Sequence, residues 1–160
     1  MHSGGGTATS NGPRRRWAIA TVGLTLIAAV TGCGHRVPAA ARPVDVHLRD
    51  FAIDTSKPSL IAGAVSFRVT NTGPETHELI LVETDLDPSA LPLEADGITV
   101  DENAPQLRQV TALEGIRIGQ TRTVRVNLRP GHYVLFCNLE GHYLGLMHTG
   151  IDVTRPQTVK

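Results

Sequence analysis

Three side chains near the carboxyl end of the chain are spaced like metal ligands on one loop. Cys137, His142 and Met147 form a Cys-x4-His-x4-Met pattern, which places a thiol, an imidazole and a thioether close together. Soft sulfur and nitrogen donors suit copper better than magnesium, calcium or manganese, which prefer oxygen. The pattern therefore predicts a copper site with three ligands from this loop.

A fourth ligand has to come from elsewhere in the chain. A trigonal site with two histidines, one cysteine and a long axial methionine needs a second imidazole. His77 is the candidate, because it follows the Asn-Thr-Gly-Pro turn at residues 71–74 and begins an apolar strand expected over residues 77–82. Taken alone, such a histidine could equally be a core or edge residue with ordinary hydrogen bonds. The ligand loop is what favours a metal-binding role.

The elements that must position these ligands are short strands. Tyr133, Leu135 and Cys137 fall on one face of a strand with period 2, so the thiol points inward where the strand ends. Strand patterns separated by turn residues are also expected over residues 44–53, 60–70, 77–82, 116–118, 121–128 and 149–153. About seven or eight strands with little helical pattern predict an all-β, Greek-key β-sandwich.

Together these parts resemble a known family. An Asn-x-Gly turn before the first histidine is followed some sixty residues later by a Pro-Gly-x-Tyr entry into Cys-Asn and a correctly spaced His and Met. Over residues 44–154 the sequence is similar to the cupredoxins, the small blue copper proteins, and its loop spacing is closest to their rusticyanin and sulfocyanin-like branch. The resemblance implies one copper ion per chain, with His77, Cys137 and His142 as equatorial ligands and Met147 as the axial ligand.

The sequence departs from the family pattern at three positions. Glu78 stands where many cupredoxins have Asn or Ser, which helps to hold the ligand loop, and Glu140 and Leu146 replace a Pro and a Gly common in related loops. The ligand identities are intact, but hydrogen bonds beyond the ligands tune a metal site. The reduction potential is therefore the property that the sequence leaves open.

The resemblance implies one-electron transfer and not catalysis. A fixed plane of two histidines and a cysteine with a weak axial methionine serves both copper oxidation states and keeps reorganisation small. A copper oxidase or nitrite reductase would need further histidines for a second copper centre and usually another domain. The alternative function is an extracytoplasmic copper carrier or buffer, although such proteins more often use Met-rich or His-rich tracts.

Residues 1–33 have the order of a secretory signal. Arg14, Arg15 and Arg16 precede an uncharged apolar run, residues 17–30, which is shorter than the roughly 20 residues of a membrane span. The following Val-Thr-Gly-Cys resembles a bacterial lipobox, in which Cys33 is lipidated and becomes the mature amino terminus. The alternative is cleavage nearby by an ordinary signal peptidase.

We therefore expect an exported protein that is periplasmic or lipid-anchored to the outer face of the cell membrane. A linker over residues 34–43 leads to the copper-binding domain, residues 44–154, and residues 155–160 form a tail. Removing residues 1–33 leaves twelve basic and fifteen acidic residues, which gives a net charge of about −3. Nothing in this balance points to nucleic acid, and we expect a monomer.

Two regions have open roles. Residues 83–115 are an acidic excursion that could shield one flank of the metal site, contact a partner or simply be solvated. Around His142, a set of apolar residues is expected either to form a patch where redox proteins dock or to close the end of the sandwich. This set is Leu139, Tyr143, Leu144 and Leu146.

Overall fold

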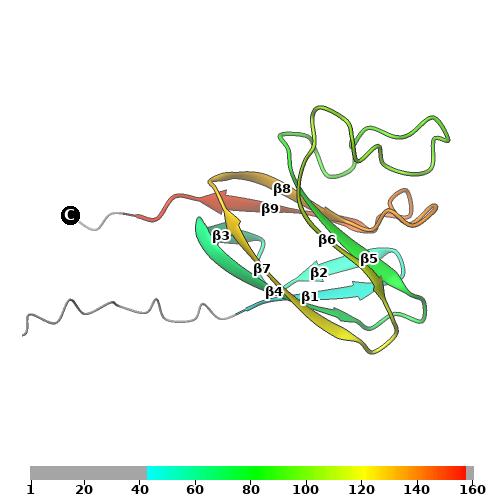
Figure 1. The fold of residues 1–160 in the computed structure, drawn as a ribbon, viewed down its shortest axis with the longest axis horizontal. Coiled ribbons are helices and arrows are strands. Elements are labelled where there is room, and N and C mark those ends of the chain that lie inside the picture. Colours follow the sequence, from blue (N-terminus) through cyan, green and yellow to red (C-terminus); the bar gives the residue numbers. More distant parts are fainter. Residues whose placement is uncertain (1–42, 158–160) are drawn as a thin grey trace, which may run out of the picture. The chain divides into compact units, whose positions relative to one another are not determined.

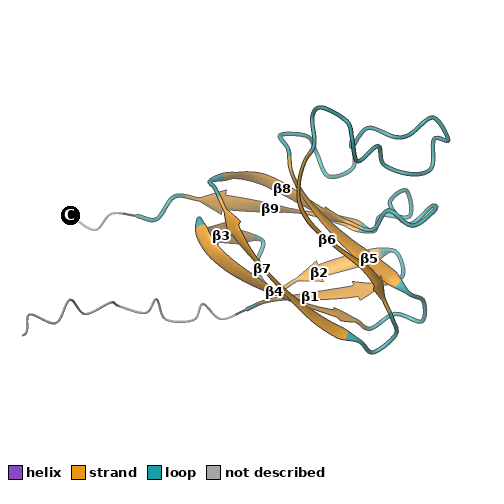
Figure 2. Ribbon diagram, viewed as in Figure 1, coloured by secondary structure: helices purple, strands orange, loops and turns teal. Residues whose placement is uncertain are grey.

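The structure is a computed structural model that describes residues 43–157. In this range the chain forms strands joined by loops and no helix (Figure 1, Figure 2). The strands are β1 (Val44–Arg49), β2 (Ala52–Thr55), β3 (Ser59–Ile61), β4 (Gly63–Asn71), β5 (His77–Glu83), β6 (Arg108–Ile116), β7 (Thr121–Leu128), β8 (Gly131–Phe136) and β9 (His148–Thr154).

These strands form two mixed sheets that pack as a sandwich. One sheet has the order β2-β1-β4-β7 and the other the order β3-β9-β8-β5-β6. β1 runs parallel to β4, and β3 runs parallel to β9, whereas the other neighbours are antiparallel. The predicted all-β Greek-key sandwich is confirmed. Within residues 43–157 it has nine strands where seven or eight were expected, because the short β2 and β3, of four and three residues, were not counted separately.

The main correction concerns β6, which was interpreted as part of the acidic excursion. Most of this strand is exposed or half-buried, and its pairing with β5 shifts register opposite Glu78, so it lacks a clean alternation. The prediction of a strand at residues 116–118 is wrong, since β6 ends at Ile116 and a turn follows. Phe51 was expected to continue the first strand but lies in the β1–β2 turn, with a φ of 62°.

The second sheet is buried on both faces at β5 and β8. Tyr133, Leu135 and Cys137 face the core between the sheets, as their alternation predicts. Val134 and Phe136 face outward, where Leu91 and Val100 from the excursion cover them. Residues 84–107 are therefore not merely a solvated loop, because they bury the outer face of β5 and β8.

Within residues 43–157, no helix could cross a membrane. The predicted signal segment, Cys33 and the linker up to residue 42 lie outside the described residues, as do residues 158–160.

Candidate metal centre

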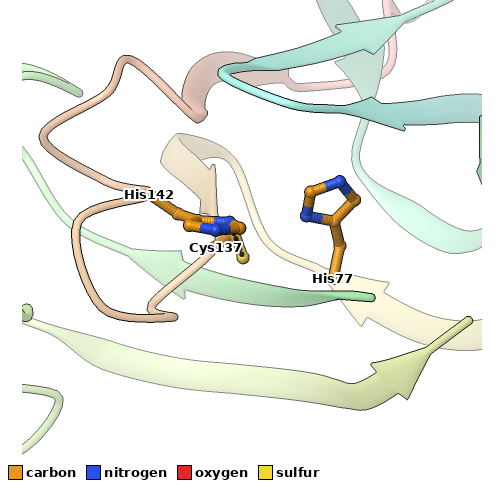
Figure 3. A group of neighbouring side chains, drawn as sticks. All are labelled: His77, Cys137 and His142. Carbon is orange, nitrogen blue, oxygen red and sulfur yellow. Dashed lines mark hydrogen bonds between the residues drawn. The ribbon is translucent and has the colours of Figure 1, made fainter. Parts of the chain in front are cut away.

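The candidate ligands meet at one end of the sandwich. His77 is the first residue of β5, and Cys137 directly follows the last residue of β8. His142 lies on the loop that joins β8 to β9 (residues 137–147), which we call the ligand loop. One ligand atom from each of these three residues lies within 4.8 Å of the others, and Figure 3 shows the three side chains converging. Sequence reasoning therefore selected residues that the fold brings together.

His77 is completely buried, and its two ring nitrogens have different surroundings. Its Nε2 lies 3.0 Å from Oδ1 of Asp50, whereas its Nδ1 is buried without any hydrogen-bond partner. Burial lowers the pKa of His77 from its usual value, with Asp50 acting in the opposite direction. A neutral imidazole with a free, buried nitrogen is the form that binds a metal.

His142 presents its Nδ1 to the same point. That nitrogen lies 3.5 Å from Sγ of Cys137, and the ring centroid of His142 lies 5.2 Å from that of His77. The Nε2 of His142 faces outward, 3.6 Å from a carboxylate oxygen of Glu75, and the side chain is 14% exposed. His142 is therefore the ligand candidate that connects the centre to the surface.

Cys137 supplies a buried thiol. Burial raises its pKa above the usual value, although the backbone N–H groups of Glu78 and Leu139 act in the opposite direction. The thiol is thus protonated near neutral pH, and a metal that binds it must displace the proton.

Met147, the expected axial ligand, ends the ligand loop. Its side chain is fully buried in the same core cluster as Cys137. The loop closes on itself, because Met147 donates its N–H to the carbonyl of His142 at 3.0 Å and accepts the N–H of Cys137 at 3.1 Å. The loop turns sharply just before this point, where Leu146 has a φ of 74°.

Glu78 takes over the task expected of the Asn or Ser that it replaces. Its carboxylate accepts the backbone N–H of Asn138 at 2.8 Å, which ties β5 to the ligand loop next to the cysteine. Burial raises the pKa of Glu78, and the hydrogen bond from Asn138 acts in the opposite direction. Although Glu78 departs from the family pattern, it keeps the link between β5 and the ligand loop.

The acidic excursion is fastened to the ligand loop by two side chains for which sequence reasoning did not predict this role. Asn138 accepts the N–H of Val100 at 2.6 Å and donates to the carbonyl of Val100 and to Glu102. The hydroxyl of Tyr143 accepts the N–H of Leu91 and donates to the carbonyl of Pro88. The only sequence signal for this cover was the unbroken apolar character of β5 and β8, which is typical of a sheet buried on both faces.

The other histidines of the described range lie apart from the cluster. His47 is exposed on β1, and His132 pairs with Asp152. His148 packs against the ring of Tyr143.

The arrangement defines a class of site. Two imidazole nitrogens, a thiol and a thioether, three of them on fully buried side chains, fit the type 1 copper set of two histidines, a cysteine and an axial methionine. The unpartnered Nδ1 of His77 independently indicates that this pocket is built around a ligand.

Comparison with solved structures agrees with this class. Dithionite-reduced auracyanin from the photosynthetic bacterium Roseiflexus castenholzii matches with a TM-score of 0.54 and 21% identity, over 69% of this chain and 94% of that one. Auracyanin B matches with a TM-score of 0.53 and 25% identity, over 71% and 89%. Rusticyanin from Thiobacillus ferrooxidans matches with a TM-score of 0.50 and 17% identity, over 72% and 79%. The chain therefore has the cupredoxin fold, as its sequence predicted.

No protein-family model matches the sequence, and no curated protein sequence matches it.

Asn71 provides a test of how the His77 loop is held. This fully buried side chain donates to the carbonyls of Glu75 and Ile116 and accepts the N–H of Gly73. Asn71→Ala leaves these groups unpaired and should lower the free energy of unfolding by about 3 kcal/mol, measured by urea denaturation. The control is Asn127→Ala on the exposed face of β7, for which we expect a change below about 0.5 kcal/mol. Equal effects of the two substitutions would contradict the role of Asn71.

Proposed function

We propose that this protein is a one-electron carrier with one type 1 copper ion, bound by His77, Cys137, His142 and Met147. The observation that supports it most is the burial of a thiol and two imidazoles whose ligand atoms lie within 4.8 Å of one another. Bound copper would supply the one-electron couple. The protein's own residues would fix the donor positions, so that the site needs little rearrangement between oxidation states.

The two histidines would then have different tasks. His77 is fully buried and would only hold the metal, whereas His142 is part of the loop surface and would give electrons a short path to a partner. Strand ends and a hydrogen-bonded loop hold the ligands more firmly than free loops would.

Electron transfer is favoured over the alternative of a copper carrier or buffer. A carrier has to release its ion to a partner, and ligands on accessible tracts suit that task. Here His77, Cys137 and Met147 are all buried, which favours retention of the ion. We also propose an electron carrier in preference to an enzyme, because a catalytic metal keeps an open position for substrate. Four protein donors would leave little room for one.

The visible spectrum tests this function directly. We expect the Cu(II) protein to be intensely coloured by charge transfer from the Cys137 thiolate and to be bleached by mild reductant. Cys137→Ser should abolish the colour, because a hydroxyl is a harder and far less acidic ligand. Met147→Leu should retain copper and raise the reduction potential, since it removes a weak donor. A colourless wild-type protein with one copper per chain would refute the proposal.

We further propose that the protein is exported and anchored to the outer face of the membrane through lipid on Cys33. This rests on the order of residues 1–33, because a basic start, an apolar run and a lipobox-like cysteine follow one another. Two or more acyl chains would anchor the protein stably, where a single chain does not.

Fractionation of cells tests the anchor. Wild-type protein should sediment with membranes, and Cys33→Ala should be released into the soluble fraction or remain unprocessed. A protein that begins at residue 34 gives the soluble reference. If Cys33→Ala partitions with membranes as the wild type does, the lipid anchor is wrong.

We propose that redox partners dock beside His142 on an apolar patch formed by Phe51, Leu144 and Leu146. These three residues are 59%, 50% and 67% exposed. Of the residues expected at this place, Tyr143 is instead buried and Leu139 is half-buried against the core. Phe51 was not expected, yet its ring centroid lies 6.1 Å from that of His142. Its left-handed backbone conformation is unfavourable for a large side chain, and such strain persists mainly at functional positions.

A single charge in the patch tests the docking role. Weak redox encounters bury little area, so Leu144→Lys should slow electron exchange with the physiological partner several-fold and leave the spectrum unchanged. Ile61→Lys is the matched control, because Ile61 is 56% exposed on β3, which pairs with the far end of β9. Equal rates for the two variants, or an altered copper spectrum in Leu144→Lys, would indicate that the patch is structural.

A further inference from the structure

Asp50, in the turn between β1 and β2, lies against the buried ligand candidate His77 from a different part of the chain. We propose that Asp50 is a positioning residue: its carboxylate keeps the proton of His77 on Nε2, directs the Nδ1 lone pair at the metal, and stabilises Cu(II) relative to Cu(I). The redox half of this inference rests on the proposed copper function. The half that concerns the imidazole proton is a property of the metal-free protein.

The contact is built into the packing of two loops. Asp50 Oδ1 lies 3.0 Å from Nε2 of His77. A Cβ at Gly73 would lie 2.9 Å from each of these two atoms, so the residue beside the contact has no room for a side chain. Thr72 fastens the same loop to the end of β1, since both its N–H and its hydroxyl donate to the carbonyl of Leu48. The turn at Asp50 and the loop before His77 are thus fitted to each other around this hydrogen bond.

The chemistry of the two partners fixes the position of the proton. A neutral imidazole has one donor nitrogen and one acceptor nitrogen, and an ionised carboxylate can only accept. The contact with Asp50 therefore makes Nε2 the donor and leaves Nδ1 as the acceptor. Nδ1 is buried with no hydrogen-bond partner, which is costly in the absence of a ligand. A metal at this point would relieve that cost.

The charge of Asp50 should matter because it is poorly screened. His77 is completely buried and the Asp50 side chain is 29% exposed, so little water separates them. A carboxylate hydrogen-bonded to a ligand imidazole makes that imidazole a stronger donor. A stronger donor and a nearby negative charge both favour the more highly charged oxidation state of copper.

The second histidine offers a matched comparison. Glu75 lies 3.6 Å from Nε2 of His142, which is beyond a good hydrogen bond, and its side chain is 65% exposed. Water and salt screen such a charge. Removing the charge of Glu75 should therefore have little effect on the potential, although both carboxylates lie next to a ligand candidate.

The first experiment uses the metal-free protein and nitrogen NMR of the His77 ring at neutral pH. In the wild type we expect widely separated signals for the two ring nitrogens, with the proton on Nε2. Asp50→Ala should populate both tautomers and draw the two signals together. Asp50→Asn keeps an oxygen acceptor and should retain the wild-type tautomer. A proton on Nδ1 in the wild type, or an unchanged tautomer in Asp50→Ala, would overturn the positioning role.

The second experiment compares the reduction potentials of the copper-loaded Asp50→Asn and Glu75→Gln proteins. Asp50→Asn should weaken Cu(II) binding about tenfold more than Cu(I) binding, which raises the potential by about 59 mV for one electron. Glu75→Gln should move it much less. Equal shifts in the two variants would overturn the electrostatic role of Asp50. If the wild-type protein shows the expected tautomer but does not bind copper, only the proposed function is refuted.

Discussion

A buried imidazole nitrogen without a hydrogen-bond partner is costly, and one end of this sandwich is arranged around such an atom on His77. The arrangement needs support from several directions. Asp50 holds the outer nitrogen of the ring, and Asn71 holds the loop that leads to it. From the other side the ligand loop brings a buried thiol and a second imidazole to the same point. A metal at this point would offset the cost of the unpartnered nitrogen, which accounts for these contacts.

The cost of leaving polar groups unpaired also accounts for the contact between the acidic excursion and the ligand loop. The acidic excursion is long and irregular, so its backbone groups need partners outside the strands. The ligand loop provides some of them, since the side chains of Asn138 and Tyr143 bond to the backbone of the excursion at Val100, Leu91 and Pro88. The apolar residues of the excursion also cover the outer face of β5 and β8. A segment that looks like an acidic loop in the sequence is thus part of the frame of the site.

The ligand candidates and the fold class could be predicted because their signals are local. The spacing of Cys137, His142 and Met147 and the alternation of β7 are visible within a few residues. Asp50 and Phe51 could not be found in this way. They lie in a turn far from the loop in sequence, and only the pairing of β1 with β4 brings that turn to the ligands. β6 was missed for a related reason, because its bulge and exposed edge hide its period.

The positions that depart from family expectation gather at the edges of the site and leave the ligands unchanged. Glu78 supplies its carboxylate to the ligand loop, where many relatives of this class have a neutral side chain. Asp50 supplies a second carboxylate to the other side of His77, and Glu75 a third near His142. Glu75 is too exposed to add much, so Asp50 is the carboxylate whose charge should matter most at this centre. With copper bound, the charge of Asp50 would stabilise Cu(II) relative to Cu(I) and so lower a reduction potential that the ligand identities alone leave open.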